Sequence, residues 1–393
     1  MKGEANMKFM FLSGWQRSGT TLVTRALDAH PNITMVSDPL LPLFKMGRNK
    51  FFKDHLGVPI KKDAPISDDF LVNKEIKKKL RENISEVFFT EEDLELLKVK
   101  LKKFNGTWKE QHAPLIIPYL EELKPGNFKN ILKQFISFIK DAYGDKNTKV
   151  IGFKQTYCEQ FMNNIIENYE SYSSIVIRDP RGAFASRNCK GKYLNRAGSK
   201  LSTLFITRNW RKSVAYHLKY KSKDNYEGIL YESFVKNPTH YLKRFCNMLN
   251  LDFSEKMIDF NYYTGGTGDK WISNSSYDSK KGFSTSSINK WENKLNNETI
   301  KAIEVLCKPE MNYLEYSLEF KNADIIEVLI NYNEDKEKIR DWEEEYGYVI
   351  NKEEIKKEIT RDYFLTNKQV NYDSELLDRF FIFKTVYNKL KNI

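Results

Sequence analysis

The sequence predicts an α/β fold with three layers, in which helices flank a central parallel sheet. One observation is a set of short apolar runs that indicate buried strands, at 8–12, 33–36, 149–154, 174–178 and 228–231. A second is that helical patterns lie between these runs, and such alternation is typical of a parallel sheet. A third is that the first run leads through a glycine-containing loop into a helix, which is the arrangement that a phosphate site needs.

The loop at residues 14–21 reads Gly-Trp-Gln-Arg-Ser-Gly-Thr-Thr. It matches the Walker A pattern G-x-x-x-x-G-K-[ST] except that Thr20 stands where the lysine belongs, and the basic residue is Arg17 instead. Backbone N–H groups and a helix N-terminus still favour a phosphate there. The absent lysine is the group that reaches the β- and γ-phosphates. The sequence therefore predicts a P-loop-like site for one 5′-phosphate-like group; the alternative is a plain turn that caps a helix.

Two regions outside the strand pattern are mostly helical. Residues 45–145 are Lys-rich and form a predicted helical insertion, with amphipathic stretches at 92–103 and 128–143. Residues 321–393 carry dense mixed charge without a strand pattern, and they predict a charged helical C-terminal extension. Further helices are expected at 212–220, 240–249 and 291–308, and a long loop at 264–290.

Composition excludes several classes of protein. No apolar run reaches about 18 residues, so no membrane span is expected. Residues 1–6 are polar and do not resemble a secretory signal. The four cysteines are widely spaced, without a C-x-x-C, which favours a reducing compartment and a cytoplasmic enzyme. The net charge of +11 suits an anionic ligand, but the motifs of nucleic-acid-binding modules are absent.

A second set of residues follows the strand predicted at 174–178. Arg178 ends this strand, at the edge where open α/β sheets bind ligands. Pro180 suits the first turn of a helix that would carry Ser186. A guanidinium beside a hydroxyl binds phosphate well. The alternative is a local charge pair between Arg178 and Asp179 that caps the helix.

Taken together, the two sites resemble the family of PAPS-dependent sulfotransferases, from about Phe9 to Tyr316. Within this family the chain looks most like the tyrosylprotein and carbohydrate branches, through Leu27-Asp28-Ala29-His30-Pro31. We therefore expect a sulfotransferase domain at 1–320, with 45–145 on the acceptor side. The matching motifs are 14–21, Ile177-Arg178-Asp179-Pro180-Arg181 with Ser186, Leu230-Tyr231-Glu232-Ser233-Phe234 with Asn237-Pro238, and Lys280-Lys281-Gly282-Phe283-Ser284 leading to Lys290-Trp291.

The resemblance implies a donor, 3′-phosphoadenosine 5′-phosphosulfate (PAPS), from which a sulfuryl group moves in line to a hydroxyl or amine. No metal is required, because a side-chain cation can stabilise the leaving oxygen. By their match to the family, Arg17 takes that role and Lys154 faces the transferring group. The implied nucleotide-binding residues are Arg17, Ser18, Gly19, Thr20 and Thr21 for the 5′-phosphate, Arg178 and Ser186 for the 3′-phosphate, and Tyr231, Lys280, Lys281 and Gly282 around the nucleotide.

The catalytic base is predicted at Asp38, which matches a glutamate of the tyrosylprotein branch. A base must lie within about 3 Å of the acceptor hydroxyl, and aspartate is one methylene shorter than glutamate. The alternative is that Asp38 only caps a turn before Pro39. Rival bases are His55, His112 and Glu159, whereas His30 precedes Pro31 in a motif that looks structural.

Two other functions compete with sulfuryl transfer. A P-loop nucleotide or small-molecule kinase would need the missing lysine and an aspartate such as Asp179 for Mg²⁺. A binding module that has lost activity would keep the fold without turnover. The acceptor itself, whether sugar, tyrosine, lipid or metabolite, does not follow from the sequence, and a homo-oligomer is left open.

Overall fold

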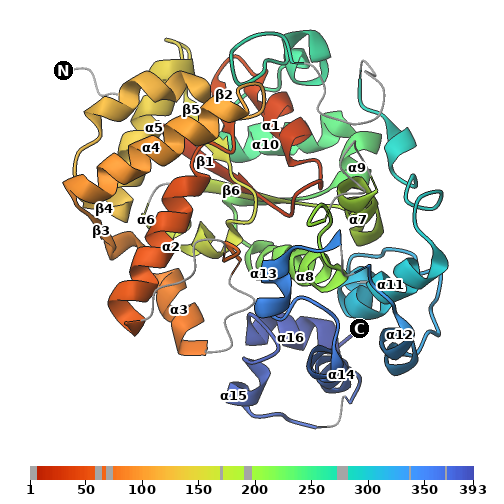
Figure 1. The fold of residues 1–393 in the computed structure, drawn as a ribbon. Coiled ribbons are helices and arrows are strands. Elements are labelled where there is room, and N and C mark those ends of the chain that lie inside the picture. The colour runs from red at the N-terminus through yellow and green to blue at the C-terminus, as the bar shows by residue number, and fades with distance from the viewer. Residues whose placement is uncertain are drawn as a thin grey trace.

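A computed structural model describes residues 7–57, 64–67, 74–168, 171–189, 197–271, 282–335, 338–367 and 370–393. At its centre is a five-stranded sheet in the order β2-β5-β1-β6-β7, and every pairing in it is parallel (Figure 1). Its strands are β1 (Lys8–Ser13), β2 (Ile33–Ser37), β5 (Val150–Lys154), β6 (Ser171–Ile177) and β7 (Tyr226–Leu230).

The predicted α/β fold is confirmed, and all five predicted strands are present. The largest shift is in β6, which begins at Ser171 rather than at 174. Its first residues include Ser171 and Ser173, which are buried although they are polar, so the apolar pattern begins too late. In the structure they pair with Phe9 and Phe11 of β1.

Helices cover both faces of the sheet, and side chains alternate between these faces along each strand. Phe9 and Phe11 point into one hydrophobic core, whereas Met10 and Leu12 point into the other. Around the first core lie α5 (Phe128–Tyr143), α6 (Met162–Asn168) and α8 (Thr203–Tyr220); around the second lie α1 (Thr20–Asp28), α9 (Tyr231–Lys236) and α10 (Pro238–Leu249).

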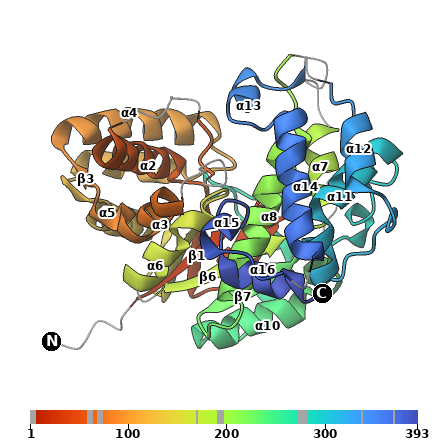
Figure 2. The same cartoon turned by 90° about the horizontal axis from the view of Figure 1, so that it is seen from below.

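The segment between β2 and β5 forms a mostly helical layer at one side of the molecule (Figure 2). Helix α4 starts with a capping box, in which Thr90 and Asp93 satisfy each other's backbone N–H groups. A two-stranded sheet that the sequence did not predict also lies here. The elements are α2 (Leu41–Leu56), α3 (Lys74–Asn83), β3 (Phe88–Phe89), α4 (Glu91–Thr107), β4 (Gly126–Asn127) and the 3₁₀ helices Ile84–Glu86 and Pro114–Glu122.

The C-terminal helices lie at the other side of the molecule from this insertion, where they pack against α8 and α11 (Figure 2). Residues 321–393 are helical, as the sequence predicts, and contact α8 and α11. Phe364 and Leu390 belong to the same hydrophobic core as Phe11 of β1. The remaining helices of the described ranges are α7 (Pro180–Asn188), α11 (Asn297–Tyr313), α12 (Ile325–Asn331), α13 (Asp341–Glu345), α14 (Lys352–Thr366), α15 (Ser374–Leu377) and α16 (Lys384–Lys391), with 3₁₀ turns at Glu159–Phe161, Glu255–Ile258, Phe260–Tyr262 and Thr285–Ser287.

Buried ion pairs join the C-terminal segment to α8. The Glu358 carboxylate pairs with Arg208 at 2.7 Å and with Arg211 at 2.6 Å. At the start of α8, Glu334 accepts hydrogen bonds from the backbone and hydroxyl of Thr203. Charge on 321–393 therefore faces inward at these positions rather than forming a solvated surface.

Two helices start at different places from those predicted. Helix α8 begins nine residues before the expected 212, where the Ser202 hydroxyl accepts a hydrogen bond from the Phe205 N–H. Helix α11 begins at Asn297 rather than 291, because Asn296 caps it by accepting from the Thr299 N–H. None of the helices in the described ranges is both long and apolar enough to cross a bilayer.

Candidate active site

The predicted site residues lie where the five parallel strands end. The loop 14–21 follows β1, Asp38 follows β2, and Lys154 is the last residue of β5. Arg178 follows β6 and Tyr231 follows β7. Because the strands are parallel, all five carboxyl ends lie at one edge of the sheet, where open α/β sheets bind ligands.

Two glycines shape the phosphate loop. Gly14 has φ of +143°, and a Cβ atom there would lie 2.5 Å from the carbonyl oxygen of Val176 on β6. Gly19 has φ of +91° and precedes α1, to which it offers no side-chain cap. The first N–H groups of this nine-residue helix are therefore left for another acceptor, as a phosphate cradle requires.

Two buried polar atoms at this edge fit an anionic ligand. The Ser18 hydroxyl and the Arg178 Nε are both buried, and neither has a hydrogen-bond partner among the described residues. Buried polar groups normally have partners, so such orphans mark a place where a ligand can bind. The donors on both sides of the loop thus suit a nucleotide that carries a 5′- and a 3′-phosphate.

Arg17 links the two predicted phosphate sites. Its Nε donates a hydrogen bond to the Ser186 hydroxyl on α7 over 3.0 Å. Its carbonyl oxygen accepts a hydrogen bond from Arg178 Nη1 over 3.1 Å. Arg17 adopts φ of +66°, an uncommon conformation for a residue with a side chain. The loop backbone is therefore held against the strand end that carries Arg178.

Tyr231 fills the space between the phosphate loop and Arg178. The Arg178 guanidinium lies 4.7 Å from the centre of the Tyr231 ring, a cation–π arrangement. A Cβ atom on Gly19 would lie 2.3 Å from the same ring, so only glycine fits there. The Tyr231 hydroxyl shares a hydrogen bond with Ser287, whose carbonyl oxygen accepts from Arg178 Nη2 over 2.8 Å. Ser287 is a site residue that the sequence analysis missed.

The alternative for Arg178, a charge pair with Asp179, is not what the structure contains. Asp179 accepts a hydrogen bond from the Arg181 N–H and so caps α7. Its carboxylate pairs with Arg181, which also pairs with Glu304. Asp179 is thus fully engaged in the start of α7, and the position that a kinase would use for Mg²⁺ serves a structural purpose.

Lys154 and Asp38 form a buried ion pair on the other side of the loop. Their strands are neighbours, and Ser37 pairs in register with Lys154. The Lys154 ammonium contacts the Asp38 carboxylate and lies 3.4 Å from the Thr21 hydroxyl. The Lys154 side chain is only 3% exposed. Its ammonium lies between Thr21 of the phosphate loop and the predicted base.

The Asp38 carboxylate is surrounded by donors. Oδ1 accepts from the backbone and hydroxyl of Thr156, at 3.0 and 3.1 Å, and from Gln155 at 3.3 Å. Burial raises its pKa, but Lys154 and the Thr156 N–H outweigh burial and hold the pKa below its usual range. Asp38 is therefore charged at neutral pH. Gln155 and Thr156 were missed, although they form a polar run directly after an apolar strand.

Among the rival bases whose side chains are described, His112 lies near this pair. Its Nδ1 is 3.2 Å from the Phe104 carbonyl oxygen, which can only accept, so Nδ1 carries the proton. Burial lowers the pKa of His112, opposed by the charge of Asp38 and reinforced by that of Lys154. The ring is therefore neutral, with Nε2 able to accept a proton.

His30, His55 and Glu159 were also considered as sites of proton transfer, and those whose side chains are described have structural contacts. His30 accepts from the Asn32 N–H and contacts the Asp252 carbonyl oxygen, so both ring nitrogens are occupied. Glu159 is buried and lies 3.1 Å from Lys212. His55 belongs to α2, but its side chain lies outside the described residues.

The late loop is described only in part. Lys280 and Lys281, predicted to close over the nucleotide, lie outside the described residues. Gly282 has φ of +123°, with open space where a side chain would be. Within the described ranges, His, Cys, Asp and Glu side chains do not gather in groups of three that could hold a metal.

Comparison with known families identifies part of the chain. Residues 174–315 match the family described as "Sulfotransferase domain". This range runs from β6 to α11 and includes Arg178, Ser186 and Tyr231, whereas the phosphate loop, Asp38 and Lys154 lie before it. The match to a sulfotransferase domain thus covers this part of the chain, which holds the strand end and the helix that carry the predicted 3′-phosphate motif.

Solved structures of sulfotransferases are similar to this chain at low identity. The sulfotransferase domain of the Synechococcus PCC 7002 olefin synthase is 16% identical, with 81% of this chain and 98% of that chain covered and a TM-score of 0.46. The sulfotransferase domain from the curacin biosynthetic pathway is 18% identical, over 80% and 100% of the two chains, with a TM-score of 0.43. Retinol dehydratase, solved with retinol and PAP, is 13% identical over 80% and 84%, with a TM-score of 0.33. No curated protein matches the chain.

Proposed function

We propose that this protein transfers a sulfuryl group from PAPS to a hydroxyl, or an amine, of its acceptor. The observation that carries the proposal is the position of Arg17, which donates to Ser186 while its carbonyl oxygen accepts from Arg178. One residue of the 5′-phosphate loop is thus bonded to both residues predicted to bind a 3′-phosphate. A kinase for triphosphates has no need for this second site.

In this proposal some groups bind the two phosphates and others stabilise the leaving oxygen. The α1 N-terminus, Ser18 and Thr21 bind the 5′-phosphate, while Arg178 and Ser186 bind the 3′-phosphate. When bound, PAPS supplies an activated sulfuryl group on a phosphate leaving group. Arg17 and Lys154 stabilise the negative charge that develops on the bridging oxygen as its bond to sulfur breaks. Arg17 does so without giving up a proton, because its guanidinium stays charged.

Asp38 is the proposed base, as the sequence resemblance implies. It accepts the proton of the acceptor hydroxyl while the oxygen bonds to sulfur, and Lys154 keeps the carboxylate oriented. His112 is the alternative acceptor of this proton, favoured by its neutral ring and its place beside Asp38 and Lys154. The motif at 27–31 and the acid after β2 support the tyrosylprotein and carbohydrate branch, and the cysteine pattern supports a cytoplasmic enzyme.

The first experiment measures binding of the product, adenosine 3′,5′-bisphosphate, by calorimetry. Adenosine 5′-monophosphate, which lacks only the 3′-phosphate, is the matched ligand. We expect the bisphosphate to bind at least about 10-fold more tightly, because a charge-assisted hydrogen bond contributes roughly 1.5–3 kcal/mol. Arg178→Met should remove most of this preference, whereas Arg244→Met on α10, where the side chain is 52% exposed, should leave it intact.

The second experiment follows transfer from sulfur-labelled PAPS to a panel of hydroxyl acceptors in the presence of EDTA. Labelled product is expected without added metal. Equal binding of the two nucleotides, together with consumption of ATP that depends on Mg²⁺, would replace the proposal with the kinase. Tight binding of the bisphosphate with no labelled product from any acceptor would indicate a binding module.

A further inference from the structure

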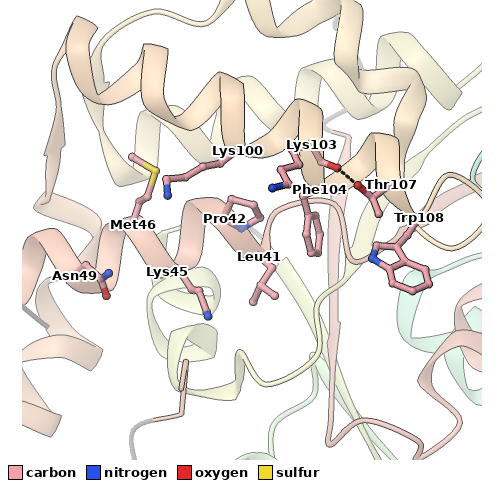
Figure 3. Close-up of a pocket in the computed structure, with 10 residues that line it drawn as sticks. All are labelled: Leu41, Pro42, Lys45, Met46, Asn49, Lys100, Lys103, Phe104, Thr107 and Trp108. Carbon is pink, nitrogen blue, oxygen red and sulfur yellow. Dashed lines mark hydrogen bonds between the residues drawn. The ribbon is translucent and has the colours of Figure 1, made fainter. Parts of the chain in front are cut away.

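A cavity of about 470 Å³ lies between α2 and α4, beside the candidate active site (Figure 3). Its apolar side includes Leu41, Met46, Phe104 and Trp108, and the Trp108 side chain is 56% exposed. The volume falls within the range of small-molecule sites, which are apolar with a few placed polar groups.

Two residues of the cavity wall are linked to the surroundings of the proposed base. Leu41 is the first residue of α2 and follows Asp38 by three positions. The Phe104 ring stacks on the His112 ring with their centres 4.2 Å apart. Asn105 Nδ2 donates to the Pro39 carbonyl oxygen over 3.1 Å, which ties the end of α4 to the segment after Asp38. The cavity therefore lies close to Asp38 and His112.

The charged side chains that line the cavity are all basic. Lys45, Lys100 and Lys103 line it, and none of its lining residues is acidic. Lys100 and Lys103 extend from α4 over the space that faces α2 (Figure 3).

Neighbouring lysines on the same helix behave differently. Lys98 pairs with Glu95 at 2.7 Å, and Lys102 pairs with Glu121 at 2.5 Å. Within the described residues, by contrast, no carboxylate pairs with Lys100 or Lys103. Two ammonium groups at an apolar cavity, those of Lys100 and Lys103, without acidic partners among the described residues favour an anion there.

We propose that this cavity binds the acceptor and selects a small amphipathic molecule that carries an anionic group. The apolar body lies against Phe104, Trp108 and Leu41, the anionic group lies at Lys100 and Lys103, and the acceptor hydroxyl points toward Asp38. The anion is a carboxylate or a phosphate, which share the chemistry that an ammonium recognises. The assignment of the cavity to an acceptor rests on the proposed function.

The first test measures binding without catalysis. Anilinonaphthalenesulfonate is an anionic aromatic probe, and N-phenylnaphthylamine is its neutral counterpart; both report binding by fluorescence. Lys100→Met and Lys103→Met should each weaken binding of the anionic probe by about 3- to 10-fold and leave the neutral probe unchanged, since a partly exposed charge contact contributes about 1 kcal/mol. Lys133→Met on the exposed face of α5 is the matched control and should change neither.

The second test uses transfer from labelled PAPS to matched acceptors. An ω-hydroxy fatty acid is compared with its methyl ester and with the corresponding ω-hydroxyalkyl phosphate. We expect the acid or the phosphate to have the higher kcat/KM, and the two arms show which anion the cavity prefers. Lys103→Met should raise KM for the anionic acceptor by about 3- to 10-fold while kcat and KM for the ester stay the same.

The outcomes separate this inference from the proposed function. If the ester is used as well as the acid, or if both probes respond equally to the lysine substitutions, the anionic cavity is wrong while sulfuryl transfer stands. If the anionic probe binds as expected but the protein neither prefers the bisphosphate nor transfers label, the cavity stands as an anion site and the proposed function fails.

Discussion

The Arg17 Nε donates to the Ser186 hydroxyl across 3.0 Å, although 169 positions separate the two residues in the chain. The bond joins the loop after β1 to the first helix after β6, two elements that flank adjacent strands. The cation proposed to stabilise the leaving oxygen is thereby oriented by the residue proposed to bind the 3′-phosphate. In the proposed function, nucleotide recognition and charge stabilisation are thus coupled through the Arg17 side chain.

This coupling gives a prediction for Arg17. We expect Arg17→Ala to lower kcat by about 10²- to 10³-fold, because a preorganised donor to the leaving oxygen is lost. Ser186→Ala should lower kcat much less and weaken bisphosphate binding by about 3- to 10-fold. Single-turnover rates and calorimetry on both variants measure the two effects. An Arg17→Ala variant with full turnover would remove Arg17 from the chemistry.

The pH dependence of turnover identifies the base. A base works when deprotonated, so kcat/KM falls on the acid side of its pKa. Lys154 and Thr156 hold the Asp38 pKa below its usual range in spite of burial, so with Asp38 as base kcat/KM should stay level down to about pH 4. With His112 as base, whose pKa burial lowers from 6.5, the fall should begin well above that pH.

Substitution of the two candidates completes this test. Asp38→Asn should lower kcat by about 10²- to 10⁴-fold and leave bisphosphate binding unchanged, whereas His112→Gln should have an effect below about 10-fold. The reverse order of the two effects, with an acid limb that disappears in His112→Gln, would assign the proton to His112.

Because the Glu358 carboxylate is buried beside two arginines, we expect its substitution to lower the stability of the protein strongly. Burial raises its pKa, but Arg211 and Arg208 outweigh burial and hold it far below the usual range. Glu358→Gln leaves two buried arginines without this partner, and we expect the free energy of unfolding to fall by about 3–5 kcal/mol. Glu353→Gln, on the exposed face of the same helix, should change it by less than about 0.5 kcal/mol. Urea titrations of both variants give the comparison.

The buried carboxyl of Glu334 predicts that the stability of the protein falls as the pH rises. Burial raises its pKa to about 7 in spite of hydrogen bonds from Thr203. The folded protein therefore holds this proton more tightly than the unfolded chain, whose glutamate titrates near 4.5. The stabilisation is complete below that value and is lost as the pH rises through about 7.

Glu334→Gln should remove this component. The wild-type protein should lose about 1–3 kcal/mol more stability than the variant between about pH 5 and about pH 8, measured by urea unfolding at each pH. Exposed Glu327→Gln on α12 is the control and should follow the wild type. Parallel pH profiles of wild type and Glu334→Gln would show that this carboxyl titrates normally.

The sequence predicted the elements that depend on local pattern. The five strands, α5 and the phosphate loop all follow from apolar periodicity and turn residues near one another in the chain. Each of the five strand ends also carried a predicted site residue, because parallel strands place their carboxyl ends together.

The contacts between distant segments could not be predicted in this way. The Asp38–Lys154 pair, 116 positions apart, depends on the strand order that puts β2 beside β5. Ser287 reaches Arg178 from a loop with no periodic pattern. The purpose of the dense charge in 321–393 did not follow from the sequence, and only the arginines on α8 show why its carboxylates are buried.

Because those carboxylates follow α8 by more than 100 residues, the arginines of α8 gain their ionic partners late in synthesis. Trp210 of α8 donates its indole N–H to the Arg178 carbonyl oxygen over 2.7 Å, and Arg208 and Arg211 flank it on the same helix. On a ribosome, α8 emerges long before α14 brings the partners of these arginines. A nascent chain therefore holds the arginines of α8 without these partners until α14 has been made. Until then, the helix whose Trp210 contacts the strand end at Arg178 lacks the ion pairs that anchor it.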